Sequence, residues 1–217
     1  MNEPDANRDV RSLDDLLANL DACGESRRWA EGKTLHEIWT TCERGDWLLW
    51  LAAQMEGRSG WHTRQRIVLA ACACAETALK HVPEGEDRPR LAIEVARRWA
   101  GGTAEPAEVW AARDAARHAY LGLCDRLAVA ALAALDACAL ADAYAADHGC
   151  TASQAAEIAA ECAWDAAVAA ATVFSVDLQT GCTGSPRLGR SIARREMAKI
   201  VRGVLAEPLG AATDGAA

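Results

Sequence analysis

The residues of this sequence best suited to chemistry are carboxylates that recur at helical spacing in its second half. Two sets of three acidic residues would each line up along one side of a helix. The members of the first set are eleven residues apart and those of the second set four apart: Asp125, Asp136 and Asp147, then Glu157, Glu161 and Asp165. Carboxylates in such stripes could bind a metal ion, act as acids or bases, or attract a basic protein.

The stripes need an explanation, because like charges four residues apart destabilise an isolated helix. Residues 121–180 hold eight acidic residues and one basic residue, so this segment has a net charge of −7. The whole chain has a net charge of −8. We predict that the six acidic residues form a partner-binding surface that steers a basic protein. A second interpretation is a solvated face balanced by a basic C-terminal helix. The basic residues of that helix are Arg187, Arg190, Arg194, Arg195, Lys199 and Arg202.

A third interpretation of the stripes is a metal site, but ferritin-like carboxylate sites use Glu-x-x-His motifs and the sequence has none. Asp114 and His118 are four residues apart and could bind a metal ion or act as a base. A surface contact explains them better, since no second histidine pair lies nearby. The sequence also lacks a glycine-rich phosphate loop, a nucleophile elbow and zinc-finger spacing. We therefore predict no catalytic residues, no metal and no cofactor.

The nine cysteines favour small core residues over a disulfide framework, because their number is odd and the chain is long. Cys72 and Cys74 are the only close pair. On a helix they would point about 200° apart, so they could not hold one ion from the same face. We expect reduced, buried thiols.

The elements that must position these residues are all predicted to be helices. Alanine, which has the highest helix propensity, is abundant and allows helices to approach closely. No strand-like alternation and no long linker occurs, so we predict an all-α fold with one multi-helix domain over residues 12–206. That domain would be an antiparallel helical bundle or a short α–α superhelix. Residues 1–11 and 207–217 are expected to be disordered tails.

Capping signals place the helix ends. Thr34 and Glu37 form a capping box, Thr151 is an N-cap, and Asp46 is expected to cap a helix that carries Trp47. A central helix is expected over 62–81, where Ile67 to Ala75 is all apolar or small. The later helices are expected over 87–100, 106–120, 123–147, 151–178 and 185–205. In the first of these, Leu91, Val95 and Trp99 recur every four residues and should be buried.

The absence of a basic start with an apolar run, and of an apolar stretch of about 18 residues, predicts a cytoplasmic protein without a membrane span. The acidic balance argues against nucleic-acid binding, because phosphates attract basic surfaces. The eight tryptophans are therefore expected in the core.

Four segments resemble the immunity proteins of bacterial polymorphic toxin systems, in the group with an alanine-rich helical domain. They are Cys42–Trp50 (CERGDWLLW), Ala71–Ala75 (ACACA), Glu86–Glu94 (EDRPRLAIE) and Arg98–Gly102 (RWAGG). The resemblance spans about residues 34 to 204. It implies an all-α protein that neutralises a toxin by binding it, and it carries over no catalytic residues.

The leading hypothesis is thus a binding protein of the immunity type that covers the active surface of a basic toxin. One alternative is a helical enzyme or metal-binding protein, with an interhelical pocket built from Asp114, His118 and the carboxylate stripes. Another is a homo-oligomeric helical scaffold. The sequence names neither the partner nor the oligomeric state.

Overall fold

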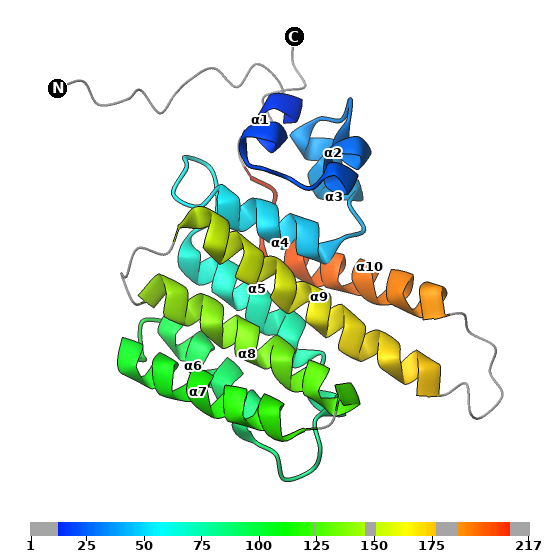
Figure 1. Cartoon of the computed structure of the whole chain (residues 1–217). Coiled ribbons are helices and arrows are strands. Elements are labelled where there is room, and N and C mark those ends of the chain that lie inside the picture. The colour runs from blue at the N-terminus through cyan, green and yellow to red at the C-terminus, as the bar shows by residue number, and fades with distance from the viewer. Residues whose placement is uncertain (1–12, 124, 146–150, 177–185, 209–217) are drawn as a thin grey trace.

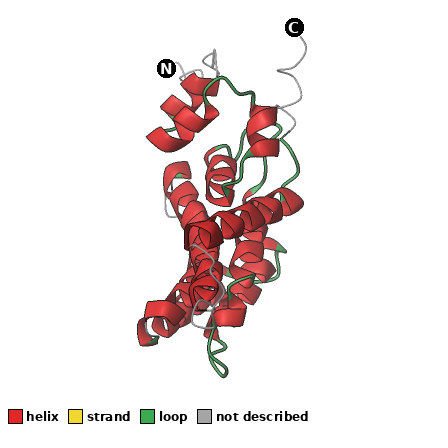
Figure 2. Cartoon of the chain, turned by 90° about the vertical axis from the view of Figure 1, so that its right-hand side faces the viewer, coloured by secondary structure: helices red, strands yellow, loops and turns green. Residues whose placement is uncertain are grey.

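The computed structural model describes residues 13–123, 125–145, 151–176 and 186–208. Every element in these ranges is a helix (Figure 2), which confirms the all-α prediction. In chain order they are α1 Leu13–Asn19, α2 Gly24–Ala30, α3 Leu35–Thr41, α4 Gly45–Gln54, α5 Arg64–Glu76, the 3-10 helix η1 Leu79–His81, α6 Arg88–Ala100, α7 Pro106–Gly122, α8 Asp125–Ala145, α9 Ala152–Val176 and α10 Pro186–Val204.

The helices form a large stack and a smaller N-terminal group. Helices α4 to α10 lie side by side in the stack, where α9 packs against α4, α8 and α10 and where α5 touches α6, α8, α9 and α10 (Figure 1). The short helices α1, α2 and α3 lie above α4 in the same view. We call α1–α3 the cap and α4–α10 the body. None of the described helices combines the length and apolarity that a membrane crossing requires.

The core of the body is built from small side chains. Buried alanines and cysteines of α5, α8 and α9 dominate it, together with Leu49 and Ile67, which are 0% exposed. The thiol of Cys162 lies 3.3 Å from the carbonyl oxygen of Ala71 and 3.4 Å from that of Ala133, and its one proton can be donated to either. Such thiols serve as small core residues that also satisfy buried carbonyl groups.

All six cysteines in the described ranges are free, as predicted, and five of them are buried. Burial raises the pKa of the Cys74 thiol to about 12, which keeps it protonated and inert. Cys124, Cys150 and Cys182 lie outside the described residues.

Several predicted helix ends are confirmed. Thr34 and Glu37 form both hydrogen bonds of the capping box before α3. Thr151 accepts from the Gln154 amide at 3.2 Å, while the Gln154 side chain accepts from the Thr151 amide at 2.9 Å. Helix α6 ends before Gly101, and Pro106 begins α7.

Other predicted boundaries were wrong. The N-cap of α4 is Arg44, and Asp46 lies inside the helix, where its carboxylate binds Arg44 instead of capping the backbone. The central helix α5 stops at Glu76 rather than at 81, and η1 follows it. Helix α2 was not predicted, because its sequence GESRRWA has no apolar periodicity.

The buried face of α6 also differs from the prediction. Ala92, Ile93 and Ala96 face the core, whereas Leu91 is 46% exposed and Trp99 is half-buried. The Trp99 ring stacks on Tyr144 of α8, with ring centroids 6.4 Å apart. Alanines make up most of the buried core of the body. In α6, Leu91 and Trp99 therefore lie at the edge of the buried face rather than at its centre.

The folded contacts of the described residues reach past the predicted domain end at residue 206. The Glu207 carboxylate lies 2.6 Å from Nδ1 of His36 in the cap, and Pro208 is fully buried. These two residues therefore belong to the folded domain. The predicted tail 1–11 and the rest of the predicted tail 207–217, residues 209–217, lie outside the described residues.

Candidate functional site

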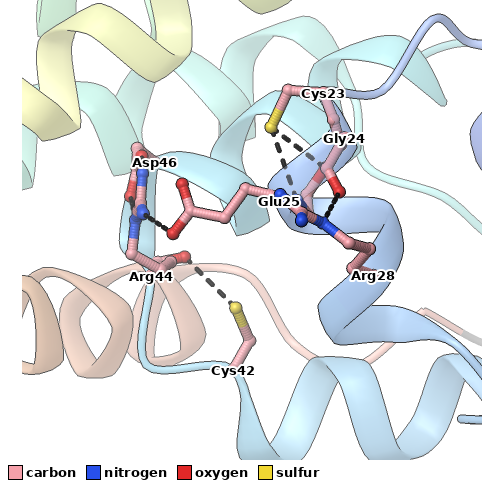
Figure 3. A network of polar contacts seen from close by, with 8 residues as sticks. Cys23, Gly24, Glu25, Arg28, Cys42, Arg44 and Asp46 are labelled. Carbon is pink, nitrogen blue, oxygen red and sulfur yellow. Dashed lines mark hydrogen bonds and ion pairs between the residues drawn. The ribbon is translucent and has the colours of Figure 1, made fainter.

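The turn between α3 and α4 brings the guanidinium of Arg44 into contact with three helices. Arg44 Nη2 and Nε donate to the Asp46 carboxylate, at 2.6 Å and 2.9 Å, and Nη1 lies 3.5 Å from Glu25 Oε1 in α2 (Figure 3). Burial is the largest single influence and would lower the pKa of Arg44, but the hydrogen bond to Asp46 and the negative charges of Asp46 and Glu25 together outweigh it and raise the pKa. The guanidinium is therefore a fixed positive charge that joins the cap to the body.

Two tryptophans pack on the faces of this guanidinium. Its central carbon lies 4.3 Å from the ring centroid of Trp47 in α4 and 5.4 Å from that of Trp164 in α9. Arg194 of α10 lies over the same Trp164 ring at 4.5 Å. Trp164 remains 37% exposed, although arginines approach it from two helices. Cation–π contacts of this kind hold these four side chains in defined positions.

Glu161 completes this surface, because it precedes Trp164 by three residues on α9 and the two share a helix face. Glu161 is exposed. We call the four residues Arg44, Glu161, Trp164 and Arg194 the Trp164 face.

Beside the Trp164 face runs a polar groove of about 470 Å³ between the cap, α4 and α10. Both charge signs and two tryptophans line it: Glu25, Trp29, Lys33, Thr41, Cys42, Glu43, Arg44, Trp47, Ser191 and Arg194. Arg195 bridges the groove edge to Glu43, with Nε 2.8 Å from Oε2.

The structure describes the side chains of four of the six predicted partner-binding residues, and these four lie in different surroundings. Glu157 and Glu161 are exposed on α9. Asp147 lies outside the described residues, and the side chain of Asp125 does as well. The last two, Asp136 of α8 and Asp165 of α9, face each other between the packed helices rather than solvent.

Asp136 and Asp165 form a carboxyl pair joined by a side-chain hydrogen bond, which requires one of them to be protonated. Burial raises the pKa of Asp136 to about 8, and the negative charges of Asp165 and Glu161 add to the shift. Burial likewise raises the pKa of Asp165 to about 6. This pair is consequently a poor surface for steering a partner.

Two basic residues of α10, Arg195 and Arg202, make their contacts outside the acidic helices α8 and α9. Arg202 Nη1 donates to the Cys42 carbonyl oxygen at 2.7 Å, and Arg195 pairs with Glu43. Both contacts reach the α3–α4 turn. The side chains of Arg187 and Arg190 lie outside the described part of the chain.

Asp114 and His118 lie together on α7, with His118 Nδ1 2.9 Å from the Asp114 carbonyl oxygen and 3.5 Å from its carboxylate. Their side chains are 46% and 61% exposed. No group of three or more candidate metal ligands occurs among the described residues. The pair therefore has the geometry of a surface contact.

Sequence reasoning missed the Trp164 face. The segment Arg44-Gly45-Asp46-Trp47 was noticed as a helix start, but Trp164 is more than a hundred residues away along the chain. The one available signal was Glu161 and Trp164 at helical spacing in an acidic segment.

No protein-family model, curated protein or solved structure matches this chain.

Proposed function

We propose that this protein is a non-catalytic binding protein of the immunity type, which neutralises a cognate toxin by direct contact. The observation that carries this proposal is the Trp164 face. Tryptophan and arginine are the residues most enriched in the energetic centres of protein interfaces. Here an exposed tryptophan packs against two arginines, Arg44 and Arg194.

Preorganisation of the Trp164 ring supports a role in recognition. Arg44 is tied to Asp46 by three hydrogen bonds, so the ring packs against a guanidinium that is already immobile. A side chain that is ordered before binding loses less conformational entropy in a complex. Trp164 can therefore act as a rigid apolar anchor.

The exposed carboxylates of α9 favour a basic partner. Glu157 and Glu161 are exposed along the same helix, and the chain carries a net charge of −8. Acidic rim residues accelerate the encounter with a basic protein and repel nucleic acid. A toxin whose active surface binds nucleic acid, such as a nuclease, has the complementary chemistry.

The test pairs the chain with the toxin domain encoded beside its gene. We expect the purified proteins to form a complex and co-expression to restore growth of toxin-producing cells. Trp164→Ala should weaken binding by about thirtyfold or more, equivalent to about 2 kcal/mol. Glu161→Lys should slow association, and less so at high salt.

Trp110→Ala is the matched control, because Trp110 is 62% exposed on α7, a helix that packs on α6 and α8. It should bind as the wild type does. The proposal is wrong if no adjacent toxin binds, or if Trp164→Ala and Trp110→Ala bind equally well while both keep the wild-type melting temperature.

A further inference from the structure

A second, more enclosed hollow lies between the cap and the body. It is a cavity of about 280 Å³ lined by residues of α1, α2, α3, α4 and α9. Leu17, Ile38 and Leu51 contribute to it from the hydrophobic cluster of the cap, and Leu48 contributes from the core of the body. The cavity thus lies between the hydrophobic cluster of the cap and that of the body, whose side chains leave this space unfilled.

The walls of the cavity are aromatic and its mouth is acidic. Trp29, Trp47 and Trp50 line it, and Asp21 and Cys23 are exposed at its edge. No lysine or arginine is among its lining residues. A pocket with apolar walls and a few convergent polar groups is the usual form of a small-molecule site.

Two of these tryptophans form a wall shared with the neighbouring groove, and cations already occupy their groove side. Lys33 lies 4.6 Å from the Trp29 ring centroid and Arg44 lies 4.3 Å from that of Trp47. Both cations line the groove but not the cavity. The cavity side of this wall therefore offers indole surface without a basic residue from the described part of the chain.

The uncompensated charge at the cavity is that of Asp21. The other acidic lining residue, Asp46, is 7% exposed and is neutralised by its paired hydrogen bonds to Arg44. Asp21 follows α1 in the left-handed backbone region, with φ 55°. Aspartate and asparagine tolerate this conformation better than most other residues do.

We propose that this cavity binds a small hydrophobic amine, with its apolar body against the three tryptophans and its ammonium group at Asp21. The size fits, because a cavity of about 150 Å³ holds benzene, and 280 Å³ leaves room for a short aminoalkyl chain. An ammonium gains from both the carboxylate and the electron-rich faces of the indole rings. An anion would meet the repulsion of Asp21.

Calorimetric titration of the full chain with three probes of nearly equal size tests the proposal. Phenethylamine carries the positive charge, 2-phenylethanol is its neutral counterpart and phenylacetate is the anion. We expect phenethylamine to bind about tenfold more tightly than the alcohol, and phenylacetate to bind most weakly. Equal affinities for the amine and the alcohol, or no binding of the amine, would overturn the proposal.

Asp21→Asn isolates the charge, since asparagine keeps the size and the backbone preference of aspartate. It should remove the preference for the amine over the alcohol, whereas the control Asp114→Asn on α7 should keep it. Ala160→Phe places a ring in the cavity and should abolish binding of both probes, with melting temperature as the check on folding. An unchanged preference in Asp21→Asn counts against the proposal even if Ala160→Phe fails to fold. The titrations use only these small molecules, so their outcome is independent of toxin binding.

Discussion

The cap and the body are packed in different ways. The cap cluster consists mainly of leucine, isoleucine and methionine side chains around α1–α3 and one side of α4. The body core consists mainly of alanine and cysteine, which let α5, α8 and α9 approach closely. Close packing of small side chains leaves little free volume, whereas the large side chains of the cap leave a cavity at the junction with the body.

This difference in packing indicates which region resists unfolding and which region opens more readily. The body helices contact one another extensively, while each cap helix is short and meets few neighbours. Regions with few buried contacts open more readily than the rest of a fold. We infer that the body sets the global stability and that the cap can adjust at its cavity. The following predictions test that division, in order of decreasing effect.

Truncating one core residue in each region should separate them most clearly. Ile67→Ala in α5 should lower the free energy of unfolding by about 4 kcal/mol, because its side chain is 0% exposed among small residues that cannot collapse inward. Leu17→Ala in α1 should cost about 2 kcal/mol, since Leu17 already borders a cavity. Urea unfolding measures both. Equal losses would mean that the cap is as tightly coupled as the body.

Glycines in the two regions provide a matched pair. A Cβ at Gly45 would lie 2.6 Å from Met197 Cβ and 2.8 Å from the Ala198 nitrogen, where α4 meets α10. Gly45→Ala should therefore lower the free energy of unfolding by about 3 kcal/mol. Gly24→Ala, where a Cβ meets nothing within 4 Å, should change it by less than about 0.5 kcal/mol. If Gly45→Ala is neutral, the close approach of α4 and α10 is adjustable.

The same contrast explains which features could be predicted from the sequence. Helix ends at Thr34, Thr151 and Pro106 follow from short-range capping chemistry, so local signals sufficed. The buried face of α6 could not be predicted from its large residues, because Ala92 and Ala96 make part of its contact with the rest of the body. Hydrophobic periodicity marks a core only where the core is made of large side chains.

The candidate sites were harder to predict, because they depend on contacts between helices. Spacing within α8 and α9 suggested two exposed stripes, but it could not reveal that Asp136 and Asp165 meet each other when those helices pack. Likewise, nothing local to Arg44 indicates that Trp164 lies over its guanidinium. The spacing of residues along one helix was predictable from the sequence, whereas side-chain contacts between two helices were not.

The buried carboxyl pair makes the stability of the body depend on pH. The folded pKa values of Asp136 and Asp165, about 8 and about 6, exceed the ordinary value of 3.8. Their favourable contribution is therefore complete below about pH 4 and is lost as the pH rises through 6 to 8. Asp136→Asn should raise the free energy of unfolding by about 1–2 kcal/mol at pH 9, because the neutral amide donates to Asp165.

At pH 5, Asp136→Asn should change stability little, since Asp136 is then protonated. Glu157→Gln is the control, because Glu157 is exposed on α9, and it should show no such pH dependence. Denaturant titrations at pH 5 and pH 9 measure both variants. A stabilisation that is the same at both pH values would show that Asp136 keeps its charge across this range.

The smallest effect concerns thiol reactivity rather than stability. Cys23 is exposed at the start of α2 in the cap. Partial burial opposes its ionisation, but the hydrogen bonds with the Ser26 side chain and with the backbone of Ser26 and Glu25 lower the pKa of the thiol overall. In the body, burial raises the pKa of Cys72 and of Cys138 to about 12. Iodoacetamide reacts with thiolates, so in native protein at pH 8 it should modify Cys23 before either of these residues.

Peptide mass spectrometry over a time course would follow each of these cysteines separately. Cys42 is informative because it lines both the cavity and the groove, yet it is buried and its pKa is raised to about 11. It should react more slowly than Cys23 and faster than Cys72, since opening of the cap would expose it while the body stays folded. If Cys42 and Cys72 react at the same rate, the cap opens only when the whole domain unfolds, and the distinction between the two regions fails.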